Sequence, residues 1–247
     1  MRIHVGLPGG SYGRTLTGDD VLIVPELLCA QEELSLYHSI VQEIQSAQEE
    51  GVKDTKWASW KDGCHLINKA PECSEAYRTA VAKIIAYFRI SEASVYSRFN
   101  WYVNGADWKP LHHDTAAFSQ RRLGKQNITV GVSLGGEREL VFRHVQHGTL
   151  AYFPQPNGMA FSFGRRININ WKHGINALPV EKHQQLGRIS IILWGWSDLV
   201  DEDPGDPGAV PKAEAFQRSC RQFQKGKCTY GDRCKFTHVD EPAETAM

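Results

Sequence analysis

The chain has 247 residues, 41% of them hydrophobic, and its 28 Lys and Arg are balanced by 28 Asp and Glu. This length allows one sizeable folded domain and a small second unit, and the apolar content excludes a chain that is disordered throughout. The neutral balance excludes a uniformly basic surface, so any nucleic-acid contact requires a local basic patch.

The sequence contains neither a targeting signal nor a membrane span that we can identify. Residues 1–12 have no apolar run of signal-peptide length, and no stretch reaches the roughly 18 apolar residues of a membrane-spanning helix. We therefore expect a protein of the nucleus or cytoplasm that binds no membrane, and we expect it to be a monomer.

Two amphipathic helices are predicted in the first part of the chain, over Pro25–Gln48 and Ser74–Arg89. In both, apolar residues recur at spacings of three and four, which is the periodicity of a helix with one buried face. The stretch between them, Trp57–Cys73, carries tryptophans but shows no clear period.

After Ile90 the pattern changes to short runs with period two, bounded by Gly, Pro and Asn, which indicates consecutive β-strands. Helices followed by six or more strands predict a mainly β domain of the α+β class. The expected architecture is an antiparallel sandwich or jelly roll buttressed by the N-terminal helices. The predicted strands are Val95–Tyr102, Ile128–Leu134, Glu139–Phe142, Thr149–Phe153, Ala160–Phe163 and Arg188–Trp196.

From Ser197 to Pro211 the sequence is rich in Asp, Glu, Pro and Gly. Such a composition cannot build a core and is typical of a linker. We therefore predict a folded domain over residues 1–198, a linker over 199–213 and a small second domain over 214–242.

Metal-binding residue types follow the strand predicted to end at Tyr102. His112 and Asp114 flank His113, and His173 comes about sixty residues later. Side chains two apart in an extended chain point the same way, so His112 and Asp114 can face one metal. A second His would complete a facial 2-His-1-carboxylate triad, which suits Fe(II). With ten His in the chain, an ordinary surface triple remains the alternative.

Arg188 opens the apolar strand Ile189-Ser190-Ile191-Ile192-Leu193-Trp194. A guanidinium buried in such a strand is costly unless it is paired, and a ligand carboxylate would pair it through two charge-assisted hydrogen bonds. The alternative is an edge-strand Arg whose head group reaches solvent.

The region from about Asp19 to Trp196 resembles the AlkB-type Fe(II)- and 2-oxoglutarate-dependent dioxygenases, whose fold is a double-stranded β-helix. The matching residues, in order, are Asn100-Trp101-Tyr102-x-x-Gly105, His112-x-Asp114, Val132-Ser133-Leu134-Gly135, His173-Gly174 and Arg188.

The resemblance implies a ligand set for the site. His112, Asp114 and His173 would hold iron, Asn100 and Tyr102 would touch 2-oxoglutarate, and Arg188 would grip one of its carboxylates. Strand parity agrees, because Asn100 and Tyr102 share one strand face. One position departs from the family pattern: Trp194 stands where the family commonly has a second Arg, six residues after the first.

Cys220, Cys228, Cys234 and His238 follow the spacing C-x7-C-x5-C-x3-H. Four such ligands close a tetrahedral Zn(II) site, which can fold a segment too small for an apolar core. The segment resembles the CCCH zinc fingers, a family that typically binds single-stranded RNA.

The finger is also rich in aromatic and basic residues. Aromatic rings can stack on bases, and cationic side chains can meet phosphates. The predicted stacking residues are Phe223, Tyr230 and Phe236, and the predicted phosphate contacts are Arg221, Lys225, Lys227, Arg233 and Lys235. The alternative is a protein-binding finger whose aromatic residues pack around zinc.

Two further regions are candidate substrate contacts. The basic loop Gln120–Lys125 follows the iron ligands and would attract phosphate to the mouth of the site, or it is a solvated loop. Trp57 and Trp60 lie where the family places its substrate-covering lid and would stack on an extruded base, or they fill the core.

These features predict an Fe(II)- and 2-oxoglutarate-dependent dioxygenase that uses O2 and carries one Zn(II) finger. The expected substrate is RNA or single-stranded DNA, and the expected reaction is oxidative demethylation of N-methylated bases. Two alternatives remain: a protein hydroxylase that uses the finger for docking, and a non-catalytic RNA-binding adaptor.

Overall fold

The computed structural model describes residues 1–60, 65–68, 71–119, 122 and 124–201. The chain divides into two compact units, residues 1–205 and 206–247, and the described elements belong to the first. Within this described part, no helix has the length and apolar character needed to cross a membrane.

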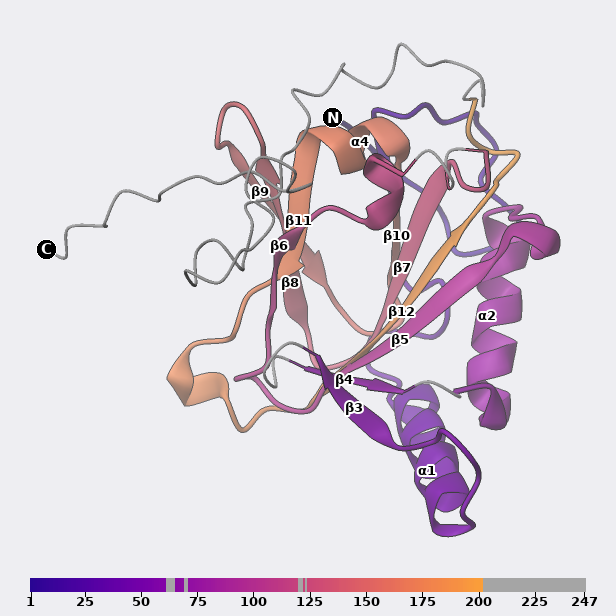
Figure 1. The fold of residues 1–247 in the computed structure, drawn as a ribbon, viewed down its shortest axis with the longest axis vertical. Coiled ribbons are helices and arrows are strands. Elements are labelled where there is room, and N and C mark those ends of the chain that lie inside the picture. The colour runs from indigo at the N-terminus through magenta and orange to yellow at the C-terminus, as the bar shows by residue number, and fades with distance from the viewer. Residues whose placement is uncertain (61–64, 69–70, 120–121, 123, 202–247) are drawn as a thin grey trace, which may run out of the picture. The chain divides into compact units, whose positions relative to one another are not determined.

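The larger of two β-sheets has eight strands in the order β1-β2-β10-β7-β12-β5-β4-β3 (Figure 1). All neighbours in it are antiparallel except β1 and β2. Its strands are β1 (Arg2–Val5), β2 (Asp20–Val24), β3 (Trp57–Trp60), β4 (His65–Asn68), β5 (Tyr96–Tyr102), β7 (Ile128–Gly135), β10 (Ala160–Gly164) and β12 (Arg188–Gly195).

The smaller sheet has four antiparallel strands in the order β6-β11-β8-β9. They are β6 (Lys109–His112), β8 (Arg138–His144), β9 (Leu150–Gln155) and β11 (Trp171–Ile175). The mainly β jelly roll with N-terminal helices that was expected from the sequence is confirmed.

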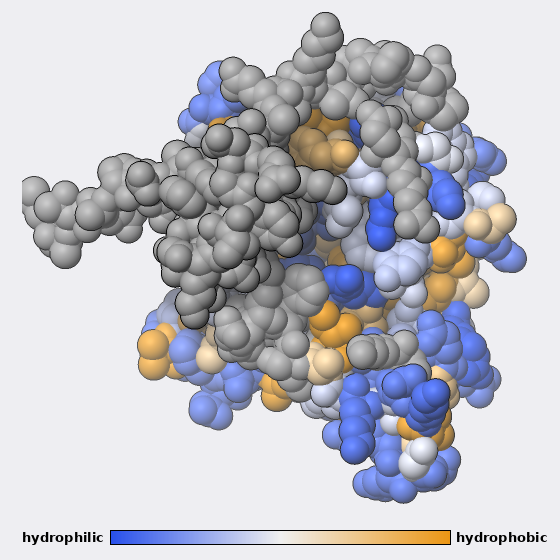
Figure 2. Space-filling model, viewed as in Figure 1, coloured by the Kyte–Doolittle hydropathy of each residue, from blue (hydrophilic) through white to orange (hydrophobic). Residues whose placement is uncertain are grey.

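The helices α1 (Ser35–Glu49) and α2 (Glu75–Tyr87) pack on one face of the larger sheet, and the short helix α4 (Arg165–Asn170) follows β10 (Figure 1). The apolar sides of α1 and α2 join the strands in one core, while hydrophilic residues gather over the outward end of α1 (Figure 2). This core includes Tyr37, Ile40, Ile44, Ile84, Phe88, Val130, Val132, Ile189, Ile191 and Leu193.

Strand alternation divides the larger sheet into two faces. On β7 and β12 the residues Val130, Val132, Ile189 and Ile191 pack into the core that the helices share. The intervening residues point the opposite way, toward the smaller sheet, since side chains alternate along a strand. A second apolar cluster, which includes Phe142 of β8, fills one part of that inner space.

Several element boundaries differ from the sequence prediction. The first helix begins at Ser35 instead of Pro25, because residues 25–34 form turns in which Glu26 has a positive φ of 52°. The aperiodic stretch Trp57–Cys73 contains the β3–β4 hairpin. The short strands β1, β2, β6 and β11 were not predicted; β2, for example, is buried along nearly its whole length and shows no alternation.

The folded unit also extends past the predicted start of the linker at residue 199. Leu199 and Val200 belong to the apolar core, and Val200 forms a β-bridge with Leu16. Residues 199–201 are therefore part of the folded unit, and the Asp201 N–H donates to the Leu16 carbonyl. The other predicted boundaries, to residue 242, fall outside the described residues and stay predictions.

Helix α2 begins at a side-chain cap that can be tested. The Ser74 hydroxyl is buried and accepts a hydrogen bond from the Tyr77 N–H at 3.0 Å. We expect Ser74→Ala to lower the free energy of unfolding by about 1 kcal/mol, measured by urea denaturation. Ser91→Ala is the matched control, because Ser91 precedes a short helical turn without a side-chain cap bond. Equal losses in the two variants would show that the cap contributes nothing.

Candidate metal centre

The pairing of β6 with β11 brings two histidines to one point of the smaller sheet. His112 and His173 are register partners across this pair, and their ring centroids lie 4.5 Å apart. His173 is also packed against the rings of Phe142 and Phe163. His173 is therefore held by the strand pairing and by the aromatic core behind it, and His112 by the strand pairing and by the ring of His173.

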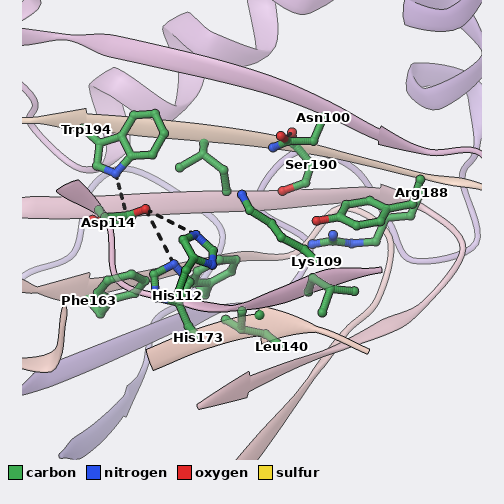
Figure 3. Close-up of a pocket in the computed structure, with 16 residues that line it drawn as sticks. Asn100, Lys109, His112, Asp114, Leu140, Phe163, His173, Arg188, Ser190 and Trp194 are labelled. Atoms are coloured by element: carbon green, nitrogen blue, oxygen red, sulfur yellow. Dashed lines mark hydrogen bonds and ion pairs between the residues drawn. The ribbon is translucent and has the colours of Figure 1, made fainter. Parts of the chain in front are cut away.

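Asp114 follows β6 and completes the group. Its Oδ1 lies 3.7 Å from Nε2 of His112 and 3.7 Å from Nε2 of His173 (Figure 3). The three potential ligand atoms all lie within 4.8 Å of one another. Metal bonds to imidazole nitrogen and carboxylate oxygen are about 2.0–2.2 Å long, so a small inward movement of these side chains would let one ion reach all three atoms.

Hydrogen bonding and burial prepare the imidazoles for a metal. Nδ1 of His112 lies 2.9 Å from the Pro110 carbonyl; donation of its proton there leaves the Nε2 lone pair facing Asp114. Burial is the main cause that lowers the pKa of His112 to about 3 and that of His173 to about 4. Both rings are therefore neutral at pH 7, which is the form that binds a metal.

The backbone of Asp114 is fixed by Asn168 of α4. The Asp114 N–H donates to the Asn168 side-chain oxygen at 2.9 Å, and the Asn168 amide donates to the Asp114 carbonyl at 3.2 Å. His113, as expected from strand parity, is turned elsewhere: its Nδ1 lies 2.6 Å from the Asn168 carbonyl oxygen. Asn168 thus orients the loop that carries the carboxylate.

The Asp114 carboxylate remains ionised in spite of its burial. Burial raises its pKa, but the neighbouring His173 and His112, the Trp194 N–H and Lys109 outweigh this effect, and the net pKa lies below the ordinary value. A buried carboxylate beside two neutral imidazoles is a ligand set for a divalent cation.

A pocket with about 430 Å³ of empty space, part of it at the open mouth, adjoins the triad (Figure 3). Its polar wall comes from the inner faces of β5 and β12, where Tyr102 pairs with Arg188 and Asn100 with Ser190. Lys109 of β6 extends into the same pocket (Figure 3). The structure therefore brings all six iron-site and co-substrate residues predicted from the sequence around one cavity.

Arg188 is the most deeply buried charged group of this pocket, with 1% of its surface exposed. Its Nε donates to Ser133 Oγ at 2.7 Å, and its guanidinium lies 5.4 Å from the Tyr102 ring centre. Burial lowers its pKa to about 10, so it is still charged at pH 7. Because β12 lies between β5 and β7, the alternative of an edge-strand Arg that reaches solvent is excluded.

A donor left over in the pocket fits an anionic ligand. Within the described residues, Nη1 of Arg188 is buried without a hydrogen-bond partner, and no carboxylate forms an ion pair with Arg188. The Oδ1 of Asn100 is buried without a partner as well, but it is an acceptor and would take a donor from a ligand. Such buried polar atoms ordinarily have partners. With Lys109 adding a second cation, the pocket suits a dicarboxylate such as 2-oxoglutarate.

Sequence reasoning missed several residues of the site. Asn168 orients Asp114, but nothing in its sequence context marks it. Ser133, which accepts from Arg188, lies in the matching segment Val132-Ser133-Leu134-Gly135, but it was given no role of its own. Lys109 precedes the ligand His112 by three residues, and a register irregularity between β6 and β11 lies between them. Such an irregularity cannot be read from the residue pattern, so strand parity gave no reason to single out Lys109.

The other predicted contacts have different outcomes. Trp57 is half-buried, with its ring 5.4 Å from Phe99 and 4.9 Å from Trp101, so it fills part of the core, and a stacking role for it stays a prediction. The Trp60 side chain lies outside the described residues. In the basic loop, only Arg122, Gly124 and Lys125 are described, and Arg122 lies over the Tyr96 ring.

The predicted residues of the finger all lie outside the described part of the chain. These are the zinc ligands Cys220, Cys228, Cys234 and His238, the aromatic residues Phe223, Tyr230 and Phe236, and the basic residues Arg221, Lys225, Lys227, Arg233 and Lys235.

Comparisons with known proteins bear on both parts of the chain. The family model of the CCCH-type zinc finger matches residues 218–238, which include the four predicted zinc ligands. No curated protein matches the chain. Among solved structures, a prolyl-4-hydroxylase from Pseudomonas putida is similar with a TM-score of 0.47 and 13% identity, and the match covers 71% of this chain and 91% of that one.

Proposed function

We propose that the first unit is an Fe(II)- and 2-oxoglutarate-dependent dioxygenase whose substrate is RNA or single-stranded DNA. The observation that carries the enzymatic part is the convergence of His112, Asp114 and His173 beside a pocket that ends at the buried Arg188. A metal triad and an anion anchor in one cavity are the two requirements for this class of oxygenase.

The side chains have distinct roles in the proposed reaction. The neutral Nε2 atoms of His112 and His173 and the Oδ1 of Asp114 would hold the metal beside the pocket. Arg188 takes one carboxylate of 2-oxoglutarate at the inner end, and Lys109 lies within the same cavity to balance its second charge. Phe161, Phe163 and Ile192 line the pocket and limit the access of water.

When bound, iron with 2-oxoglutarate supplies an oxidant that inserts one oxygen atom of O2 into a substrate C–H bond, while 2-oxoglutarate becomes succinate and CO2 with the other atom. On an N-methyl group the product is a hydroxymethyl amine. Loss of formaldehyde from it returns the N–H, so the atoms of O2 are fully accounted for.

Two features support a nucleic-acid substrate. The first is the match to a CCCH-type finger, with its predicted stacking and phosphate-binding residues. The second lies in the described unit, where the exposed Tyr96 packs against Trp194 and lies beneath the Arg122 guanidinium, 5.5 Å from its ring centre. Because Trp194 contacts Asp114, this aromatic and cationic cluster adjoins the metal end of the pocket. Stacking faces beside cations are suited to bases and phosphates.

The proposal is tested by incubating the full-length protein with Fe(II), 2-oxoglutarate and a panel of N-methylated RNA and DNA oligonucleotides. We expect succinate, formaldehyde and a substrate mass lower by one methylene group, and we expect none of these with Asp114→Ala. Succinate that forms only when peptides replace the oligonucleotides would identify a protein hydroxylase. If no panel member raises succinate above that of Asp114→Ala, the chain is a binding adaptor.

Arg188 is expected to set the affinity for 2-oxoglutarate without affecting the metal. Arg188→Met keeps the length of the side chain but removes the charged donors, so 2-oxoglutarate should bind about 10- to 100-fold more weakly. Calorimetric titration of 2-oxoglutarate into Mn(II)-loaded protein measures this. Arg143→Met, on the exposed part of β8, is the control and should bind 2-oxoglutarate like the unmodified protein. Unchanged affinity in Arg188→Met would assign Arg188 to a different ligand.

The finger is expected to capture substrate but not to take part in oxidation. Replacing Phe223, Tyr230 and Phe236 with Ala in the full chain should weaken binding of a single-stranded oligonucleotide, by about 1–3 kcal/mol for each lost stack. The same loss is expected when the chain is ended after Asp201. Raising the salt concentration should weaken oligonucleotide binding by the unmodified protein. Measurements at two salt concentrations, with zinc content checked, test this. Equal affinities for all proteins would remove the finger from nucleic-acid binding.

A further inference from the structure

The two oxygens of the Asp114 carboxylate have different surroundings. Oδ1 faces the two histidine Nε2 atoms at 3.7 Å, whereas Oδ2 accepts a hydrogen bond from the Trp194 indole N–H at 2.9 Å (Figure 3). Thr129 Oγ1 lies farther from Oδ2, at 3.4 Å. The indole is thus the main partner of the oxygen that points away from the histidines.

The position of the indole is strongly constrained. Trp194 is 8% exposed and belongs to β12, where its backbone pairs with Tyr96 of β5 on one side and with Thr129 of β7 on the other. Its ring lies 5.7 Å from that of Tyr96, and the Arg98 guanidinium lies 6.0 Å above it. A buried indole N–H is a donor only and needs an acceptor, and Oδ2 is the one it has.

We propose that Trp194 is a positioning residue that fixes the Asp114 carboxylate so that it offers Oδ1 alone to the metal. The proposal rests on the proposed iron site. With Oδ2 engaged, rotation of the carboxylate about its Cβ–Cγ bond would break the buried hydrogen bond from Trp194, which favours a single oxygen ligand.

The chemistry of the donor matters as well as its direction. At the position where the AlkB-type pattern has a second Arg, this chain supplies an uncharged N–H. The indole donates one hydrogen bond and carries no formal charge, so it orients the carboxylate and leaves its negative charge to the cation. The departure from the family pattern is therefore compatible with a working metal site.

The test measures metal affinity without turnover, on full-length protein whose finger is loaded with zinc. Mn(II) is the probe, since its free ion gives an electron paramagnetic resonance signal that disappears on binding and it has little affinity for thiolates. We expect Trp194→Phe, which keeps an aromatic ring but lacks the N–H, to bind Mn(II) about 10- to 100-fold more weakly than the unmodified protein. Trp196→Phe, the same change at a half-buried position two residues later, should have no effect.

A loss of folding is separated from a loss of positioning in two ways. The rise in Tm caused by saturating Mn(II) is measured against the apo form of each variant, so that a weaker site gives a smaller rise whatever the starting stability. Replacement of Trp194 by 3-benzothienylalanine, in which sulfur stands in place of the N–H, preserves the shape of the ring. It should weaken Mn(II) binding as Trp194→Phe does.

The outcomes separate this inference from the proposed function. If the unmodified protein and Asp114→Ala bind Mn(II) alike, the metal site itself is wrong. If the unmodified protein binds Mn(II) more tightly than Asp114→Ala, but Trp194→Phe and the benzothienyl variant bind as the unmodified protein does, Trp194 has no positioning role.

Discussion

The alternation of side chains along β12 is the constraint on which both the core and the pocket depend. This strand lies between β5 and β7 and is hydrogen-bonded along its length to both. Ile189, Ile191 and Leu193 point into the core shared with the helices, and the intervening residues, from Arg188 to Trp194, face the smaller sheet. A shift of one residue in the pairing of β12 would turn Arg188 and Ser190 under the helices and point aliphatic side chains into the pocket. Stability and the chemistry of the site therefore select the same register.

Charge within the pocket is arranged along the same strands. Arg188 occupies the inner end beside Tyr102, and Asp114, the carboxylate that lines the pocket, lies at the metal end against Trp194. Burial disfavours both charges, and each charge is stabilised by a ligand of the opposite sign. The guanidinium calls for an anion, and the carboxylate between neutral imidazoles calls for a cation. A metal and an anionic co-substrate that bind next to each other would satisfy both requirements and neutralise one another.

Much of this arrangement could be predicted from the sequence where residues alternate clearly. β5, β7, β10 and β12 begin and end within one residue of their predicted bounds, because each has one face in the core and another of different polarity. The face shared by Asn100 and Tyr102 followed from the same rule. β6 could not be predicted, since its four residues, which include Pro110, are all half-buried and carry no periodic signal. The contact of Trp194 with Asp114 joins segments 80 residues apart, and no local pattern contains it.

The same limit applies to two aromatic residues, Trp57 and Tyr96. Trp57 lies in a hairpin whose sequence shows no period, and only the packing of its ring against Phe99 and Trp101 reveals that it fills the core. Tyr96 attracted no attention in the sequence, yet it is 53% exposed at the first residue of β5, next to the metal end of the pocket. β5 runs from the inner end of the cavity, at Tyr102, to its rim, at Tyr96, so the position of a residue along the strand sets how deep it lies in the site. Residues near Tyr102 would therefore meet the proposed co-substrate, and the exposed Tyr96 is placed to meet a molecule that enters from outside.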